Sequence, residues 1–276
     1  MSDNFEISNP DKIVYKKDKI KKIDVIEYYI NVGELMLPFV SHRPLSVIRC
    51  HDGIDGDCFF KKHPTTEKDR VETCIIDKHE YFYISKLSQL IYQVQMGTVE
   101  FHPWGCEART VNKPNLMIFD LDPAENVSLI KLRKAVTCLK EVLDNLNLVS
   151  FIKTSGGKGY HIFVPFSNTK NWKRFSDFAN NVALLLENKH PDMFTSKLRK
   201  SERSGKIFVD WLRNKKGASC VAPYSLRARD GAGVSMPIDW KDLNKIAPSE
   251  VTIKNYKKFI NKNAWKNFFD LKQELK

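Results

Sequence analysis

The sequence of 276 residues lacks any apolar run that approaches the roughly 20 residues needed to cross a bilayer. Residues 1–25 are charged and lack the apolar core of a secretory signal. Internal repeats and low-complexity linkers are also absent. These absences argue against a membrane protein or a repeat array. They favour a cytoplasmic protein with one large domain, or two lobes that share a core.

Closely spaced cysteine pairs are missing as well. The six cysteines lie far apart and form no Cys-x-x-Cys motif. In a chain of this length they do not suggest the framework of a small disulfide-rich domain. Cys50, His51, Cys58 and His63 lie in one short segment. Their spacing fits no usual zinc-finger pattern, so a zinc site is not expected there.

Acidic residues are fewer than basic ones. The chain has 45 Lys and Arg against 33 Asp and Glu, which gives a net charge of +12. Such a balance favours a polyanionic partner, most often nucleic acid. A lysine-rich solvated surface without a ligand would give the same count, and net charge carries no information on the fold.

Strands and helices follow one another without a steady βαβ rhythm, which predicts an α+β architecture with mixed or antiparallel sheets. Helices are expected at residues 23–40 (to Gly33 or beyond, with Pro38 as the stop), 86–97, 128–146 and 171–191, with a Lys-rich helical tail from about residue 239. Strands are expected at residues 46–50, 73–77, 98–104, 116–123, 149–154, 160–166 and 206–211.

The segment LMIFDLDP, Leu116–Pro123, begins as a buried strand and ends in two acids. Because alternate residues of a strand share a face, Asp120 and Asp122 are expected to lie side by side. Asp210 ends the strand KIFVD in the same setting. Three carboxylates at neighbouring strand ends suit Mg²⁺ or Mn²⁺ and predict two-metal nucleotidyl transfer. Solvated acids at a turn are the alternative, and Asp-x-Asp also occurs in nucleases and sugar-nucleotide transferases.

The segment KTSGGKGYH joins two expected strands through a glycine loop, which consists of Ser155, Gly156, Gly157, Lys158 and Gly159. Glycines let the backbone approach a ligand and direct N–H groups at an anion, and a lysine ammonium suits phosphate. The loop is not a Walker A motif, because no Ser or Thr follows a Gly-Lys pair. His161 is expected to face the bound phosphate. The alternative is a glycine-rich hairpin with an ordinary histidine.

The motifs FDLDP, TSGGKGYH and VDW, in this order, resemble the archaeo-eukaryotic primase superfamily. More closely, they resemble the polymerase domain of bacterial DNA ligase D, an end-joining repair enzyme. NPDKIVY, HDGIDGDCFFKK, EFHPW and PYSLRAR fall where family members carry similar segments, so the resemblance covers nearly the whole chain. Cys50, His51 and Lys61 depart from the family pattern, as does the loop around Asn126, but none of them touches the three aspartates.

The resemblance implies a primase–polymerase fold of the α+β class, with mixed or antiparallel sheets and an RRM-like catalytic core flanked by helices. It implies one polymerase domain over residues 1–276. Within it, we expect an N-terminal lobe with DNA-end-binding elements at about 1–105, a catalytic core at about 106–240 and a C-terminal helical tail at about 241–276. No ligase lysine motif or phosphoesterase segment is visible, so the sequence represents either a stand-alone enzyme or an excised domain.

The resemblance also implies roles for individual residues. The catalytic and metal-binding residues are Asp120, Asp122 and Asp210. The nucleotide-binding residues are His102, Ser155, Gly156, Lys158, His161, Arg203 and Arg227. Lys12 and Lys22 are expected to grip a 5′-phosphate on the downstream side of a DNA gap or break. Phe59 and Phe60 form an aromatic pair, one member of which stacks on the template base.

These roles predict a template-directed nucleotidyltransferase that extends a 3′-hydroxyl at double-strand breaks or short gaps in non-homologous end joining. The resemblance implies two Mn²⁺ or Mg²⁺ ions, NTP or dNTP substrates with a preference for ribonucleotides, and DNA ends or gapped duplexes with a 5′-phosphate as partners. It implies a cytoplasmic, nucleoid-associated bacterial or archaeal protein, and it leaves open an association with Ku and a DNA ligase. The alternatives are a primase that starts chains de novo, a metal-dependent nuclease or glycosyltransferase, and a non-catalytic nucleic-acid module.

Overall fold

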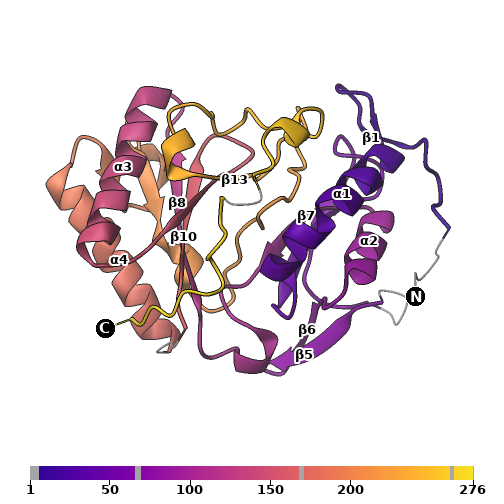
Figure 1. Ribbon diagram of the computed structural model, residues 1–276, viewed down its shortest axis with the longest axis horizontal. Helices are drawn as coiled ribbons and strands as arrows, with labels where there is room; N and C mark the ends of the chain where they lie inside the picture. Colours follow the sequence, from indigo (N-terminus) through magenta and orange to yellow (C-terminus); the bar gives the residue numbers. More distant parts are fainter. Residues whose placement is uncertain (1–5, 66–69, 168–170, 262–263, 276) are drawn as a thin grey trace. The chain divides into compact units, whose positions relative to one another are not determined.

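The computed structural model describes residues 6–65, 70–167, 171–261 and 264–275, and the chain forms two compact units (Figure 1). Unit 1 comprises Met1–Val111, Ser219–Met236 and Val251–Ile260, and unit 2 comprises Asn112–Ala218, Pro237–Glu250 and Asn261–Lys276. The chain passes repeatedly from one unit to the other, so the units differ from the three consecutive segments expected from the sequence. None of the helices in the described ranges is long and apolar enough to span a membrane.

Unit 2 is built on a six-stranded sheet with the order β11-β12-β8-β10-β9-β13. Its strands are β8 (Leu116–Pro123), β9 (Phe151–Thr154), β10 (Tyr160–Pro165), β11 (Phe194–Thr195), β12 (Ile207–Asp210) and β13 (Pro237–Ile238). β11 and β12 run parallel, and the other neighbouring pairs of this sheet are antiparallel. The strands expected on either side of the glycine loop and around the aspartates are therefore confirmed.

Two apolar strands and two amphipathic helices make the core of unit 2. β10 is buried along its whole length, and β8 is buried from Leu116 to Phe119. Helices α3 (Leu129–Asn145) and α4 (Trp172–Lys189) pack against each other and against β8 (Figure 1). Ser128 caps α3 as expected, because its hydroxyl accepts a hydrogen bond from the N–H of Lys131 at 3.2 Å.

One face of the central strands carries both polar and aromatic side chains. The pairing of β8 with β10 sets His161 opposite Asp120, and Phe163 lies two residues further along the same face. The indole of Trp265 packs on this face, with its ring centroid 5.4 Å from that of Phe163 and 5.5 Å from that of Phe151. The C-terminal segment therefore covers the apolar part of the face that carries Asp120.

This C-terminal segment is not the expected helical tail. Its described residues form turns and the short 3₁₀ helices η5 (Trp240–Asp242) and η6 (Tyr256–Lys258), without an α-helix. The side-chain amide of Gln273 donates to the carbonyl of Val149 at 3.0 Å, and the indole N–H of Trp265 donates to a carbonyl of β9 at 3.0 Å. These tertiary contacts override the helix propensity of a lysine-rich sequence.

In its described residues, unit 1 contains a three-stranded antiparallel sheet in the order β4-β3-β7, the two-stranded sheets β1-β2 and β5-β6, and two α-helices. The elements are β1 (Ile13–Tyr15), β2 (Ile20–Lys21), α1 (Lys22–Val40), β3 (Leu45–Cys50), β4 (Cys58–Lys61), β5 (Glu72–Ile76), β6 (His79–Tyr83), α2 (Leu87–Gln95) and β7 (Thr98–Pro103). Gly97 has a φ of +88° and closes α2, as the sequence predicted.

Helix α1 continues past Pro38, so the prediction that this residue stops the helix was wrong. Proline inside a helix removes one backbone hydrogen bond. Here Phe39 and Val40 are buried, and the N–H of Ser41 donates to the carbonyl of Leu37 at 2.8 Å. Side-chain packing therefore keeps the last turn helical beyond the proline.

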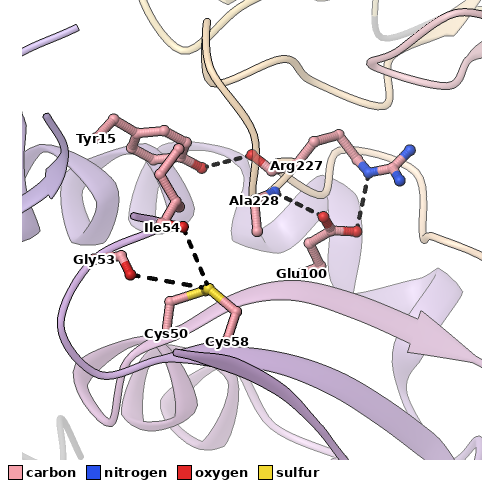
Figure 2. The surroundings of a disulfide bond; sticks show 8 residues. All are labelled: Tyr15, Cys50, Gly53, Ile54, Cys58, Glu100, Arg227 and Ala228. Carbon is pink, nitrogen blue, oxygen red and sulfur yellow. Dashed lines mark hydrogen bonds and ion pairs between the residues drawn. A yellow bond between two sulfur atoms is a disulfide. The ribbon is translucent and has the colours of Figure 1, made fainter. Parts of the chain in front are cut away.

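A disulfide joins Cys50 and Cys58, which are directly paired on β3 and β4 (Figure 2). The loop that it closes is fixed against β1. Gly53 has a φ of +82° and approaches β1 so closely that a Cβ would lie 2.9 Å from two of its carbonyl oxygens. The N–H of Ile54 donates to the carbonyl of Val14 at 2.9 Å. The sequence does not predict this pairing, since its cysteine spacing suggests neither a disulfide framework nor a zinc finger.

Candidate functional site

The structure brings together the three aspartates singled out from the sequence. Asp210 on β12 is paired directly with Asp120 on β8. Opposed residues of an antiparallel pair project from the same face with Cβ atoms about 5 Å apart. Asp122 lies two residues along β8 and shares this face. The side chains of Asp120 and Asp210 are 16% and 15% exposed, whereas that of Asp122 is 55% exposed and faces solvent.

Two arginines neutralise these acids. The guanidinium of Arg213, in the 3₁₀ helix η4 (Trp211–Asn214), lies 3.3 Å from Asp120 and 3.0 Å from Asp210. One cation therefore serves both opposed carboxylates, which would otherwise repel each other. Arg203 lies 3.7 Å from the carboxylate of Asp122.

His161 connects Asp120 to a buried lysine. The Nε2 atom of His161 lies 3.3 Å from Oδ1 of Asp120, and its Nδ1 atom lies 2.8 Å from Nζ of Lys153. Lys153 is fully buried on β9, directly opposite His161. An ammonium group only donates, so Nδ1 accepts and Nε2 carries the proton that faces Asp120. This chain of contacts fixes the orientation of the Asp120 carboxylate.

The two opposed acids have pKa shifts of opposite sign. Burial would raise the pKa of Asp120, but His161, Arg213 and Lys153 together hold it well below its ordinary value. Burial raises the pKa of Asp210, the nearby Asp120 raises it further, and Arg213 offsets only part of this. Asp120 is therefore firmly ionised, while Asp210 is the acid that gains most from an additional cation.

The donor set fits a divalent cation by its chemistry. Three carboxylates on one face of two strands are the oxygen ligands that Mn²⁺ and Mg²⁺ prefer. Arg213 contacts two of these carboxylates. With the guanidinium in this position, no three His, Cys, Asp or Glu side chains within the described ranges are arranged as a metal-binding group. A cation that bound between Asp120 and Asp210 would therefore displace the guanidinium of Arg213.

The glycine loop between β9 and β10 is organised by Ser155. Its Oγ atom accepts hydrogen bonds from the N–H groups of Gly157 and Gly159, both at 3.1 Å. The sequence predicts that the loop N–H groups point at an anion. These two N–H groups instead donate to the hydroxyl oxygen of Ser155. Gly159 is required by packing, because a Cβ there would lie 2.2 Å from the carbonyl oxygen of Leu121 on β8. Gly156 has a φ of +68°, which glycine adopts readily.

Lys158 in the loop and Arg203 beside Asp122 differ in how firmly they are held. Lys158 lies 3.6 Å from Glu125, and both side chains are largely exposed, so this pair contributes little. Arg203 stacks on the ring of Phe208 at 3.6 Å and donates to the carbonyls of residues 197 and 198 at 3.1 and 2.6 Å. Arg203 is therefore preoriented, whereas Lys158 is able to follow a ligand.

In unit 1, two of the expected nucleotide-binding residues converge on one buried acid, Glu100. Arg227 and the N–H of Ala228 donate to its carboxylate at 2.9 and 2.7 Å (Figure 2). The Nε2 atom of His102 lies 2.9 Å from the same carboxylate. Burial raises the pKa of Glu100, but His102 and Arg227 outweigh it and lower the pKa to about 2. His102 and Arg227 are thus held together by an acid that the sequence analysis did not single out.

Lys12 and Lys22 line the same cavity of unit 1, which has a volume of about 220 Å³. The ammonium of Lys12 lies 2.9 Å from Asp52, and that of Lys22 donates to the carbonyl of Ser8 at 2.7 Å. Burial lowers the pKa of Lys22, and the charge of Lys12 lowers it further. Two ammonium groups that repel each other in one cavity favour a bound anion.

Phe59 and Phe60 lie on β4, at the edge of the three-stranded sheet, and are 44% and 65% exposed. Successive strand residues point to opposite faces. The ring centroid of Phe59 lies 5.7 Å from that of His51, and the ring centroid of Phe60 lies 5.6 Å from that of His102. Each exposed ring therefore offers a face on which a base could stack.

Comparison with known proteins identifies the family of this chain. The family model "LigD, primase-polymerase domain" matches residues 21–266. The chain belongs to the LigD primase–polymerase domain family. Members are metal-dependent nucleotidyltransferases that act on DNA, and this chain is an enzyme of that class.

Curated LigD proteins and a solved LigD domain are similar to this chain. The multifunctional non-homologous end joining protein LigD of Pseudomonas aeruginosa is 34% identical over 245 residues, which is 87% of this chain and 29% of the relative. That of Mycolicibacterium smegmatis is 30% identical over 248 residues, 87% of this chain and 32% of the relative. The polymerase domain of Mycobacterium tuberculosis ligase D, solved in complex with DNA, has a TM-score of 0.85 and 28% identity, and the match covers 91% of this chain and 92% of that one. This chain spans about a third of the length of these curated relatives.

The structural match confirms the fold class expected for a LigD primase–polymerase domain, with antiparallel sheets and four α-helices in the described residues. Three residues of the site were missed by sequence reasoning. Glu100 lies two residues before His102 on β7, so strand alternation would have placed it on the same face. Lys153 contacts His161 through the pairing of β9 with β10, which the sequence does not show. Arg213 follows Asp210 by three residues in η4. Its contact with Asp120 depends on strand pairing that the sequence does not show.

Proposed function

We propose that this LigD primase–polymerase domain extends the 3′-hydroxyl of a DNA strand at double-strand breaks or short gaps in non-homologous end joining. One observation carries the proposal: β12 pairs with β8 so that Asp210 opposes Asp120, and Asp122 shares their face. The names of the curated relatives, which are end-joining proteins, support the process. The assignment to end joining is a proposal because these relatives are about three times as long as the matched segment.

In this proposal, Asp120, Asp122 and Asp210 hold two divalent cations, and the resemblance favours Mn²⁺. When bound, such ions lower the pKa of the attacking 3′-hydroxyl and stabilise the charge that develops on the leaving pyrophosphate. The contribution of the chain is to keep the acids ionised and oriented. His161 holds the Asp120 carboxylate at 3.3 Å, and Lys153 in turn holds His161 at 2.8 Å.

The nucleotide is proposed to be bound through its phosphates. The residues assigned to this role by the resemblance are His102, Ser155, Gly156, Lys158, His161, Arg203 and Arg227. Arg203 suits the role because its guanidinium is already oriented by Phe208, so little freedom is lost when it binds a phosphate. Lys158 suits it because its exposed ammonium is only weakly paired. A preference for ribonucleotides is part of the proposal and follows the resemblance alone.

The DNA end is proposed to bind to unit 1. Lys12 and Lys22 would take the 5′-phosphate at the downstream side of a gap, where a phosphate relieves the repulsion between two ammonium groups in one cavity. Phe59 or Phe60 would stack on the template base, a contact that contributes about 1–3 kcal/mol without reading sequence. The solved relative from M. tuberculosis, described as a complex with DNA, supports DNA as the partner.

We also propose an association with Ku and a DNA ligase, in the cytoplasm and close to the nucleoid. The support is chemical. A filled gap leaves a nick with a 3′-hydroxyl and a 5′-phosphate, and only a ligation reaction closes it. The curated relatives are named as multifunctional non-homologous end joining proteins, which supports the same association.

The test is primer extension on a duplex with a short gap, with either a 5′-phosphate or a 5′-hydroxyl at its downstream side, using ribo- and deoxyribonucleotides in Mn²⁺ and Mg²⁺. We expect faster extension on the phosphorylated gap. The double variant Lys12→Ala, Lys22→Ala should bring the ratio of the two rates close to one. Lys16→Ala, at an exposed lysine that does not line the cavity, should keep the ratio of the wild type.

Other outcomes would point elsewhere. If the double variant slows both gaps equally and keeps the ratio, the assignment of the 5′-phosphate to these lysines is wrong. Synthesis on a single-stranded template without a primer would indicate a primase. Degradation of labelled DNA without added nucleotide would indicate a nuclease.

A further inference from the structure

We propose that His51 is a third recognition residue of the 5′-phosphate cavity and that its imidazolium donates a hydrogen bond to the terminal phosphate of the DNA end. The inference rests on the proposed function, since it takes Lys12 and Lys22 to bind that phosphate. The resemblance assigns no role to His51, which is one of the positions where this chain departs from the family pattern.

The position of the imidazole supports this role. His51 lines the same cavity as Lys12 and Lys22. Its Nδ1 atom lies 3.5 Å from the place that a Cβ of Gly97 would take, so this edge of the ring faces Gly97, which also lines the cavity. On another side, the ring of Phe59 lies with its centroid 5.7 Å away. The ring is therefore bracketed by the end of α2 and by β4.

The backbone at His51 is held firmly. The preceding residue, Cys50, is bonded covalently to Cys58 on the neighbouring strand (Figure 2). The loop that follows His51 is tied to β1 by the hydrogen bond from Ile54 to Val14 at 2.9 Å. A side chain presented from a fixed backbone loses less freedom on binding, which favours a specific contact over a chance one.

The charges around His51 are mainly positive. The cationic groups are Arg49 on β3, Lys61 on β4, Lys12 before β1 and Lys22 at the start of α1. The acidic group is Asp52 in the loop itself. Burial lowers the pKa of His51, Arg49 and Lys12 lower it further, and Asp52 partly opposes them. Without an anion the imidazole is therefore neutral at neutral pH. Asp52 is the acid of this group, and its carboxylate is already paired with Lys12.

A phosphate in the cavity reverses this balance. Its negative charge favours the protonated imidazole, so the pKa of His51 rises when the DNA end binds. A group whose pKa is higher in the complex strengthens binding at low pH, and the gain is lost as pH rises through the pKa in the complex. Binding of a 5′-phosphorylated end should therefore take up protons through His51.

The test is fluorescence anisotropy with duplexes that end in a 5′-phosphate or a 5′-hydroxyl. It compares the wild type, His51→Gln, His51→Ala and the control His79→Gln, which changes an exposed histidine on β6. At about pH 6 we expect His51→Gln to bind the phosphorylated end about tenfold more weakly than the wild type, and at about pH 8 the two should be nearly equal. The phosphate itself gains charge with a second pKa of about 6. In His51→Gln, the affinity changes with pH through the phosphate and not through an imidazole. The difference between the wild type and this variant therefore gives the contribution of the His51 imidazole.

Calorimetry in buffers of different ionisation enthalpy supplies a readout that a purely structural role would not move. We expect the wild type to take up more protons than His51→Gln when it binds the phosphorylated duplex. If the variants keep the full preference for a 5′-phosphate and the same proton uptake, the inference about His51 is overturned while the proposed function stands. If the wild type shows no preference at either pH, and Lys12→Ala changes nothing, the proposed 5′-phosphate role itself fails. If the variants do not fold, wild-type proton uptake that is equal for both duplex ends overturns the inference.

Discussion

Arg213 contacts the two opposed carboxylates of unit 2 and supplies positive charge to both of them. Its guanidinium lies 3.3 Å from Asp120 and 3.0 Å from Asp210. Because burial and Asp120 both raise the pKa of Asp210, the pair depends on a positive charge to remain ionised. Arg213 therefore stabilises the metal-free site and competes with a metal for the same oxygens.

We expect Arg213→Gln to lower the melting temperature of the metal-free protein, because two opposed acids lose a shared cation. The same change should tighten Mn²⁺ binding by roughly fivefold, which corresponds to about 1 kcal/mol for a partly exposed ion pair. Mn²⁺ titration followed by electron paramagnetic resonance, together with melting curves with and without Mn²⁺, measures both effects. Arg174→Gln, at an exposed arginine of α4, is the control. Weaker Mn²⁺ binding by Arg213→Gln would contradict the competition.

At the residue scale, the sequence predicts which side chains share a face of the same strand. Asp120 and Asp122 share a face because they lie two residues apart on β8, and both follow an apolar run. The contacts of Arg213 with Asp120 and of His161 with Lys153 join residues on different elements. Such contacts depend on which strands pair and in which register, and a single sequence does not supply that information.

At the element scale, the hairpin of β3 and β4 is fixed by the disulfide between Cys50 and Cys58. A cross-link that closes a loop of this length removes disorder from the unfolded chain, a contribution of about 2–3 kcal/mol. The loop also carries His51 and precedes Phe59 and Phe60. The stability of this one hairpin therefore affects the residues proposed to meet the DNA end.

We expect the double variant Cys50→Ser, Cys58→Ser to unfold at a lower urea concentration than the oxidised wild type. A dithiol reductant, which is oxidised as it converts the disulfide to two thiols, should shift the wild type in the same direction and leave the double variant unchanged. Cys74→Ser, at a free cysteine of β5, is the control. Unfolding curves of the wild type that coincide with and without reductant would show that the disulfide does not stabilise the fold.

The same scale shows why some elements could be predicted and others could not. The helix capped by Ser128 and the strands around the glycine loop carry local signals: a cap, an amphipathic face and apolar runs. The disulfide carries no local signal, because Cys50 and Cys58 meet only if β3 and β4 pair in one register. The C-terminal segment follows tertiary hydrogen bonds such as that from Gln273 to Val149, and its lysine-rich composition misled the helix prediction.

At the scale of the whole molecule, composition limits the partner but not the architecture. The net charge of +12 is consistent with the polyanionic partner that the proposed function gives this chain. The expected order of lobe, core and tail differs from the observed units, since segments 219–236 and 251–260 return to unit 1. A chain that crosses repeatedly between two units leaves no composition boundary for sequence reasoning to detect.

The central claim is that the aspartates of β8 and β12 act as one catalytic group. The most direct measurement is the rate of nucleotide addition to a primed duplex in Mn²⁺ by Asp120→Asn, Asp122→Asn and Asp210→Asn, with Asp177→Asn on the surface of α4 as the control. We expect each of the three variants to lose at least about a hundredfold in rate while it stays folded, as its circular dichroism spectrum checks, and the control to match the wild type. Addition by Asp210→Asn at a rate within a few-fold of the wild type would contradict the account.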